Sequence, residues 1–136
     1  MERRPVRNGT GETRRRCVLL ADPDPRRRHA TAIQLRLGGY RVVEVGAMRE
    51  IPQAARDGID ILVSEAELED GSAVAYAAYL RRDARTGSLP ILIATYDREQ
   101  IPIAARALGD EGVLELPAAP SALLDRIGEL LAGAYR

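Results

Sequence analysis

The sequence predicts a doubly wound α/β fold built around one five-stranded parallel sheet. Five short apolar runs alternate along the chain with segments of helical period, which is the pattern of parallel strands joined by helices. A length of 136 residues, with 46% hydrophobic and 29% charged residues, suits one globular domain with a single core. We therefore expect one α/β domain behind a short amino-terminal segment.

The five apolar runs are the expected strands. They are CVLLA (17–21), YRVVEV (40–45), IDILVS (59–64), LPILIAT (89–95) and VLEL (113–116). The third and fourth runs are almost continuously hydrophobic, as expected for central parallel strands that are covered on both faces. Right-handed connections favour the flavodoxin-like strand order 2-1-3-4-5, with about five helices and a ligand edge at the carboxyl ends of the strands.

The first expected helix follows the first strand. Asp24 is suited to cap its amino end and Pro25 to occupy its first turn, and the helix would end at the glycine pair 38–39. Three apolar residues at helical spacing are predicted to form its buried stripe: Ala30, Ile33 and Leu37.

The other helices are indicated by prolines and caps. The second and fourth are expected to begin, or to be kinked, at Pro52 and Pro102, because proline removes a helical donor and restricts the residue before it. Ser72 and Ser121 are suited to cap the third and the last helix. The buried face of the last helix is predicted to contain Leu123, Ile127, Leu130, Leu131 and Ala134.

Composition limits the classes of function. Residues 1–16 hold six Arg and little to bury, so we expect a flexible basic tail there and a folded domain over 17–136. The net charge of zero gives the chain as a whole no electrostatic preference for nucleic acid or anionic lipid, except through this tail. Cys17 is alone, which excludes an internal disulfide and favours a reducing cytoplasm. No apolar run reaches the roughly 18 residues of a membrane span.

Four stretches of the chain resemble the receiver domain of bacterial response regulators, over about residues 17–134. CVLLADPDP is similar to the first strand and its acidic turn, and DGIDILVSEAELEDG to the third strand with its phosphoacceptor. LPILIATYD is similar to the fourth strand with its hydroxyl, and GVLELPAAPSALLDRI to the fifth strand and last helix. In that family an acid pair and the acceptor Asp hold Mg²⁺, a hydroxyl and a Lys bind phosphoryl oxygens, and an aromatic residue reports the state.

The carboxylates that the resemblance assigns to Mg²⁺ have changed. The acid pair reads Asp22-Pro23, and Asp24 comes one position later, where it is equally well explained as a helix cap. The acceptor position is Glu65, whose extra methylene moves its carboxylate about 1.5 Å further out. Magnesium demands near-ideal octahedral oxygen ligation, so we expect no Mg²⁺, no other cofactor and no metal site.

The remaining positions of the resemblance have changed as well, apart from one. The lysine position is Leu116, and the chain contains no lysine. The aromatic switch position is Val113, whereas Thr95 keeps the expected hydroxyl. Glu65 is either a solvated strand-end carboxylate or a residue that reaches toward Thr95 and locks one conformational state.

These features predict a module of signal transduction that binds a protein partner, or a second copy of itself, without phosphorylation and without enzymatic activity. We expect it to stand alone, because the sequence ends soon after the last helix. In receivers the partner surface is formed by the fourth helix, fifth strand and fifth helix. The corresponding candidates here are Arg98, Ile101, Arg106, Leu108, Ala118 and Ala119.

Three alternatives stay open. The chain could be a slow Mg²⁺-dependent phosphoacceptor of a phosphorelay that uses Asp22, Asp24 and Glu65. It could also bind a small ligand, or act as an accessory to a transcription regulator through its Arg-rich tail. The lack of a glycine-rich loop after the first strand argues against a nucleotide site.

Overall fold

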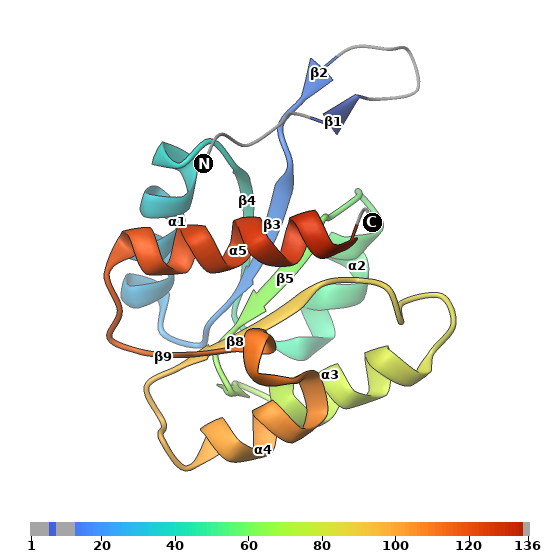
Figure 1. The fold of residues 1–136 in the computed structure, drawn as a ribbon, viewed down its shortest axis with the longest axis vertical. Helices are drawn as coiled ribbons and strands as arrows, with labels where there is room; N and C mark the ends of the chain where they lie inside the picture. Colours follow the sequence, from blue (N-terminus) through green and yellow to red (C-terminus); the bar gives the residue numbers. More distant parts are fainter. Residues whose placement is uncertain (1–5, 8–12, 135–136) are drawn as a thin grey trace.

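The computed structural model describes residues 6–7 and 13–134, and its centre is a five-stranded parallel sheet between two layers of helices (Figure 1). The elements follow in chain order as β1 (Val6–Arg7), β2 (Thr13–Arg14), β3 (Cys17–Ala21), α1 (Pro25–Leu37), β4 (Arg41–Val45), the 3₁₀ helix η1 (Met48–Glu50), α2 (Ile51–Ala55), β5 (Ile61–Ser64), β6 (Glu67–Leu68), β7 (Gly71–Ser72), α3 (Ala73–Arg82), β8 (Ile91–Thr95), α4 (Gln100–Leu108), the 3₁₀ helix η2 (Asp110–Gly112), β9 (Val113–Glu115) and α5 (Pro120–Ala134).

The main sheet has the predicted topology. Its strand order is β4-β3-β5-β8-β9 with parallel pairing throughout, which is the order 2-1-3-4-5 expected from the sequence. Each strand falls within an apolar run that predicted it, although most are shorter than the run. The two short antiparallel pairs, β1-β2 and β6-β7, lie outside this sheet.

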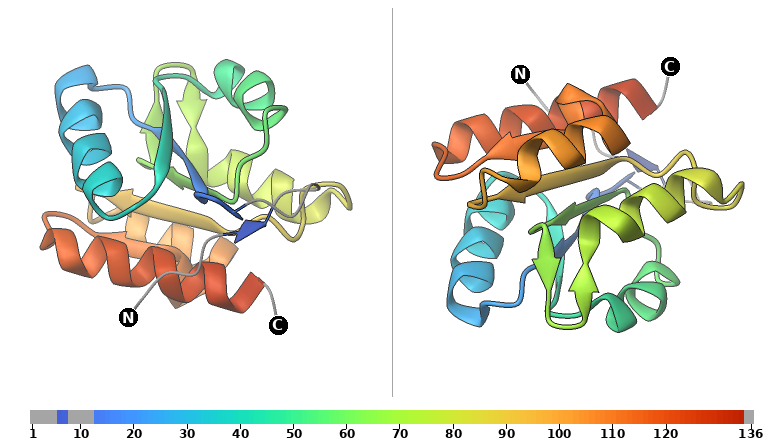
Figure 2. Two further views of the ribbon diagram at one scale, coloured as in Figure 1. Left: turned by 90° about the horizontal axis from the view of Figure 1, so that it is seen from above. Right: turned by 90° about the horizontal axis from the view of Figure 1, so that it is seen from below.

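Helices cover both faces of the sheet and bury a core on each (Figure 2). Side chains of α1 and α5 pack over one face, where Leu35 and Ile127 meet Leu20 of β3. Side chains of α2, α3 and α4 pack over the other face. Successive residues of β3 therefore alternate between the two cores, as the period of a strand requires, and both faces of the central strands are apolar.

The buried stripe predicted for α1 is wrong. Ala30 is exposed, and Ile33 and Leu37 are 47% and 84% exposed. The residues that α1 buries are Ala32 and Leu35, which lie on a different face of the helix.

A charged residue at the start of the true stripe explains the error. Arg28 lies one turn before Ala32, and its Nη1 donates to the carbonyl oxygen of Asp22 at 2.9 Å. Its Nε contacts a carboxylate oxygen of Glu44 on β4 at 3.3 Å. These two contacts of Arg28 turn the first turn of α1 toward the sheet on the side of Ala32 and Leu35. Because Arg28 is charged, apolar periodicity does not identify this face and favours the face of Ala30, Ile33 and Leu37 instead.

The expected helix starts hold with small shifts. Ser72 caps α3 as predicted, its hydroxyl accepting from the backbone N–H of Ala75 at 3.2 Å. The helices α2 and α4 begin one and two residues before Pro52 and Pro102, because proline is tolerated within a first turn.

The last helix begins two residues earlier than a Ser121 cap requires. Pro120 is its first residue, and the carbonyl of Ala119 accepts the N–H groups of residues 122 and 123 at 2.9 and 3.3 Å. Proline is well suited to this position, since its missing N–H would have no partner there. Of the predicted stripe, Leu123, Ile127 and Leu131 are buried and Leu130 is half-buried, while the side chain of Ala134 lies outside the described residues.

Part of the expected tail is paired. Val6 and Arg7 of β1 lie opposite Arg14 and Thr13 of β2. The carbonyl of Arg16 accepts from the N–H of residue 41 at 2.9 Å, which continues the β3-β4 ladder by one bond. Residues 1–5 and 8–12 lie outside the described residues, so the flexibility of the tail stays a prediction. No helix among the described residues is long and apolar enough to cross a bilayer.

A chain that starts at Arg15 should melt within about 2 °C of the full chain, because it keeps the Arg16 hydrogen bond and loses little buried surface. A start at Val18 should cost considerably more. It removes buried Cys17, whose N–H donates to the carboxylate of Asp60 at 2.7 Å. Circular dichroism melts of the two truncations test this, and a large loss for the Arg15 start would mean that the tail docks on the domain.

Candidate functional site

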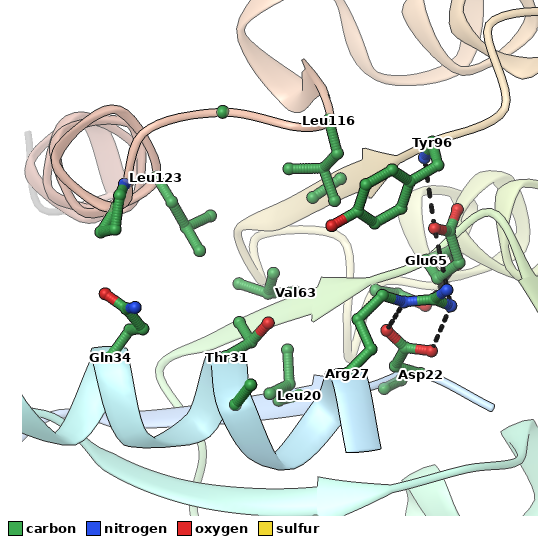
Figure 3. A pocket seen from close by; sticks show the side chains of 16 residues that line it. Leu20, Asp22, Arg27, Thr31, Gln34, Val63, Glu65, Tyr96, Leu116 and Leu123 are labelled. Atoms are coloured by element: carbon green, nitrogen blue, oxygen red, sulfur yellow. Dashed lines mark hydrogen bonds and ion pairs between the residues drawn. The ribbon is translucent and has the colours of Figure 1, made fainter. Parts of the chain in front are cut away.

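The candidate site lies at the carboxyl ends of β3, β5 and β8. From β3 the sheet continues to β4 on one side and to β5 on the other, so the chain reverses its direction of winding at this point. In open α/β sheets such a switch point leaves a crevice where ligands bind. The loops after the three strands and the start of α1 place their polar side chains around it (Figure 3).

Arg27 and Asp22 form the central contact of the site. The Arg27 Nε donates to Asp22 Oδ2 at 2.7 Å and its Nη2 donates to Oδ1 at 2.6 Å. This is a two-point pair, which is geometrically specific and stronger than a neutral hydrogen bond. The hydrogen bond to Asp22 raises the pKa of Arg27 above its usual value. The Asp22 carboxylate, which is mostly buried, therefore already has a cation bound to it.

The same guanidinium contacts the two other loops of the site. Its Nη2 lies 4.0 Å from Glu65 Oε2, and its central carbon lies 5.2 Å from the centre of the Tyr96 ring, a cation–π distance. Figure 3 shows Arg27 between Asp22, Glu65 and Tyr96. One arginine thus joins the ends of β3, β5 and β8.

Glu65 uses its carboxylate to accept backbone N–H groups. Its Oε1 accepts from Ala66 at 2.7 Å and its Oε2 from Tyr96 at 3.3 Å. Glu65 reaches the end of β8, as the sequence suggested, but its contact there is to the backbone N–H of Tyr96 and not to Thr95. The Thr95 hydroxyl instead accepts from the N–H of Asp97 at 3.0 Å. The carboxylate links the ends of β5 and β8.

The second acid of the sequence motif is a helix cap. Asp24 Oδ1 accepts the N–H groups of Arg26 and Arg27 at 3.0 and 3.2 Å, and the hydrogen bond from the Arg27 N–H, with that from Arg26, lowers the pKa of Asp24. Pro23 supplies no carboxylate. Within the part of the chain that the structure describes, no three His, Cys, Asp or Glu side chains are grouped as metal ligands.

A cavity of about 200 Å³ lies beside Arg27, between α1 and α5. Leu116 lines it, at the position where receivers carry a lysine, and Leu116 is joined to Pro117 by a cis peptide bond. Val113 does not reach this cavity, because its side chain is buried in the core under α3 and α4. The site therefore brings together Asp22, Glu65 and Leu116, but turns Thr95 and Val113 away from the cavity.

Two residues of the predicted partner surface are exposed, Arg98 just before α4 and Arg106 on α4. Arg98 forms an ion pair with Glu115 of β9 at 2.8 Å, and Arg106 is exposed on the helix. Ile103, which the sequence did not single out, is 53% exposed between them. The outward face of α4, with the residues just before it, thus combines arginines with one large apolar side chain.

The other predicted surface residues have different surroundings. Ile101 and Leu108 are half-buried and pack against the core, which leaves them little free surface. Ala119 is exposed, whereas Ala118 lines the cavity. Only part of the predicted set is therefore available to a partner.

Arg27 and Tyr96 were missed by the sequence reasoning. Arg27 lies in the run Arg26–Arg28, which looks like a solvated basic face. Its helical spacing carries a signal, since Arg27, Thr31 and Gln34 share one face at positions i, i+4 and i+7, and all three line the cavity. Tyr96 directly follows Thr95, the last residue of β8. This position at the carboxyl end of a strand is the only signal in the sequence that could have identified Tyr96 as a site residue.

No protein-family model and no curated protein matches the sequence. The fold, however, matches solved structures over most of its length. A protein described as a response regulator from Chloroflexus aurantiacus J-10-fl has a TM-score of 0.79 and 24% identity, over 88% of this chain and 99% of that one. The chemotaxis response regulator CheY4 of Vibrio cholerae gives 0.73 and 22%, over 86% and 99%.

A third similar structure is the response regulator TrrA from Thermotoga maritima, solved in complex with Mg²⁺-BeF. Its TM-score is 0.74 at 16% identity, over 85% of this chain and 98% of that one. The chain therefore has the fold of response-regulator receiver domains, as its sequence resemblance predicted.

Proposed function

We propose that this chain is a signal-transduction module of receiver fold that works without phosphorylation, by binding a protein partner or a second copy of itself. The observation that carries the proposal is the two-point Arg27–Asp22 pair. No catalytic step and no cofactor is assigned to the chain. A cytoplasmic location, in which Cys17 stays reduced, belongs to the same proposal.

Arg27 takes the role of the cation in the acidic site. In the family that the sequence resembles, Mg²⁺ neutralises the carboxylates and prepares them for phosphoryl transfer. Here Mg²⁺ would have to displace a guanidinium that makes two charge-assisted hydrogen bonds to Asp22. The next two residues supply no free ligand for Mg²⁺ to compensate for this loss. Pro23 has no carboxylate, and the carboxylate of Asp24 caps α1.

Glu65 and Leu116 remove the other requirements of phosphoryl transfer. In-line transfer depends on placement and on fixed positive charge around the moving group. The Glu65 carboxylate is held by two backbone N–H groups, and Leu116 offers an apolar side chain in place of a cation. A carboxylate bound in this way joins β5 to β8 without phosphorylation, so we propose that the free module rests in one conformational state.

The exposed face of α4 is the surface that we propose for the partner. Ile103 supplies an apolar centre and Arg98 and Arg106 supply charge beside it. Protein interfaces have an apolar core and a polar rim, and arginine is enriched in them relative to the rest of the surface.

Replacing Ile103 by Asp should abolish binding to the partner or to a second copy, because it places a charge at the centre of the interface. Ile33→Asp is the matched control, since Ile33 is exposed to a similar extent on α1. Analytical ultracentrifugation measures self-association, and capture from lysate with both variants measures the partner. Binding that survives Ile103→Asp, or that requires a phosphodonor, contradicts the proposal.

A further inference from the structure

The cavity beside Arg27 has a volume that suits a small ligand. It lies between α1 and α5, over the carboxyl ends of β3, β5 and β8, at the switch point of the sheet (Figure 3). Its volume is about 200 Å³. An apolar cavity of about 150 Å³ accommodates benzene, so this one has room for one ring with a short arm.

Most of the cavity wall is apolar. Leu20 and Val63 form its floor on the sheet, and Leu116 and Leu123 close the side next to α5. Figure 3 shows these side chains around the open space. Because Leu116 stands where the resemblance places a phosphoryl-binding lysine, the wall suits an apolar body rather than an anion.

Several of the polar groups that line the cavity are neutral. Thr31 and Gln34 reach it from α1, and the hydroxyl of Tyr96 is directed into it (Figure 3). Within the described residues, their side chains form no hydrogen bond. A hydroxyl or carbonyl group on a ligand could bond to any of the three, since hydroxyl and amide side chains both donate and accept.

The charged groups at the end of the cavity are already paired. Arg27 makes two hydrogen bonds to Asp22, and Glu65 accepts two backbone N–H groups and lies 4.0 Å from the Arg27 guanidinium. A charged ligand would lose its hydration here without gaining a free partner of opposite charge, which is costly.

We infer that this cavity is a binding site for a neutral, mostly apolar small molecule of about one ring that carries a hydroxyl or carbonyl group. Bound there, the ligand contacts α1, α5 and Tyr96, whose N–H holds Glu65. Ligand binding would then supply the input that phosphorylation supplies in other receivers. This regulatory role rests on the proposed function, whereas binding itself does not.

Three probes of nearly equal shape test the inference: 2-phenylethanol, which is neutral, phenylacetate, which is an anion, and 2-phenylethylamine, which is a cation. Titration of the full chain is followed by the amide signals of Thr31, Gln34 and Leu123 in two-dimensional NMR. The alcohol should bind at least about tenfold more tightly than either charged probe, because of the cost of burying an unpaired charge.

Two phenylalanine variants on α1 locate the site. Ala30 lines the cavity and is exposed, so Ala30→Phe should cover the opening and weaken binding of 2-phenylethanol by about tenfold or more. Ile33→Phe is the control on the same helix, because Ile33 does not line the cavity, and it should leave binding unchanged. The amide spectrum of each variant also reports whether it is folded.

The inference is wrong if 2-phenylethanol causes no saturable shifts, if a charged probe binds as tightly, or if Ala30→Phe has no effect. All titrations are made without a phosphodonor or a partner protein. A negative result in these titrations therefore does not bear on the partner surface proposed on α4. Likewise, a negative result with Ile103→Asp does not affect the ligand titrations.

Discussion

Replacing Leu35 by alanine should lower the free energy of unfolding by about 2–5 kcal/mol, the range for a leucine removed from a packed core. Leu35 is fully buried between α1 and the sheet, in the same core as Leu20 and Ile127. In a domain of this size the loss corresponds to a fall of roughly 4 °C in Tm for each kcal/mol. Urea denaturation measures the free energy, and a thermal melt measures Tm.

Leu37→Ala is the matched control, because it makes the same change two residues away on the same helix. Leu37 is 84% exposed, so its replacement should change the free energy of unfolding by no more than about 0.5 kcal/mol. The contrast tests which face of α1 meets the sheet. Equal losses for the two variants would show that α1 meets the sheet with another face.

Removing Arg27 should open the acidic site to Mg²⁺. The native chain should bind Mg²⁺ more weakly than about 1 mM, the weak end for protein carboxylate sites. The changes Pro23→Asp, Glu65→Asp and Leu116→Lys restore the groups that receivers carry at these positions. They should strengthen Mg²⁺ binding only partly, because Arg27 still makes two hydrogen bonds to the Asp22 carboxylate. Adding Arg27→Ala to these changes should tighten Mg²⁺ binding by at least about tenfold, since hydrogen bonds to charged groups contribute about 1.5–3 kcal/mol.

Arg26→Ala in the same background is the control for this experiment. Arg26 is the exposed neighbour of Arg27, and its loss changes the net charge equally without freeing the Asp22 carboxylate. Isothermal titration calorimetry compares the two quadruple variants. Equal Mg²⁺ affinities would mean that charge alone, and not the guanidinium on Asp22, keeps the metal out.

The strands and their order could be predicted because apolar runs and short connections are local properties of the sequence. The buried face of α1 could not, because Arg28 turns toward the sheet to contact the Asp22 carbonyl and Glu44. No apolar pattern records a charged residue that points inward. The start of α5 was misplaced by two residues, because serine suits an N-cap and proline suits a first helical position, and the two residues are adjacent here.

The positions of Asp22, Glu65 and Leu116 around one edge of the sheet could be predicted from the resemblance and the strand order. The hydrogen-bond partners of the two carboxylates could not be predicted in this way. Arg27 reaches Asp22 only because α1 begins at Pro25 and directs that side chain over the strand ends. Tyr96 adds a backbone N–H to Glu65, and sequence patterns assign no role to a backbone group of this kind.

We propose above that this receiver fold does not accept a phosphoryl group. Intact-mass spectrometry of the native chain after treatment with acetyl phosphate and Mg²⁺ tests it most directly, with a receiver that retains the acid pair, the acceptor Asp and the Lys as positive control. We expect the control to gain the mass of one phosphoryl group and this chain to remain unmodified. A phosphoryl group on Glu65, or on Asp22 or Asp24, would show instead that the chain is a phosphoacceptor.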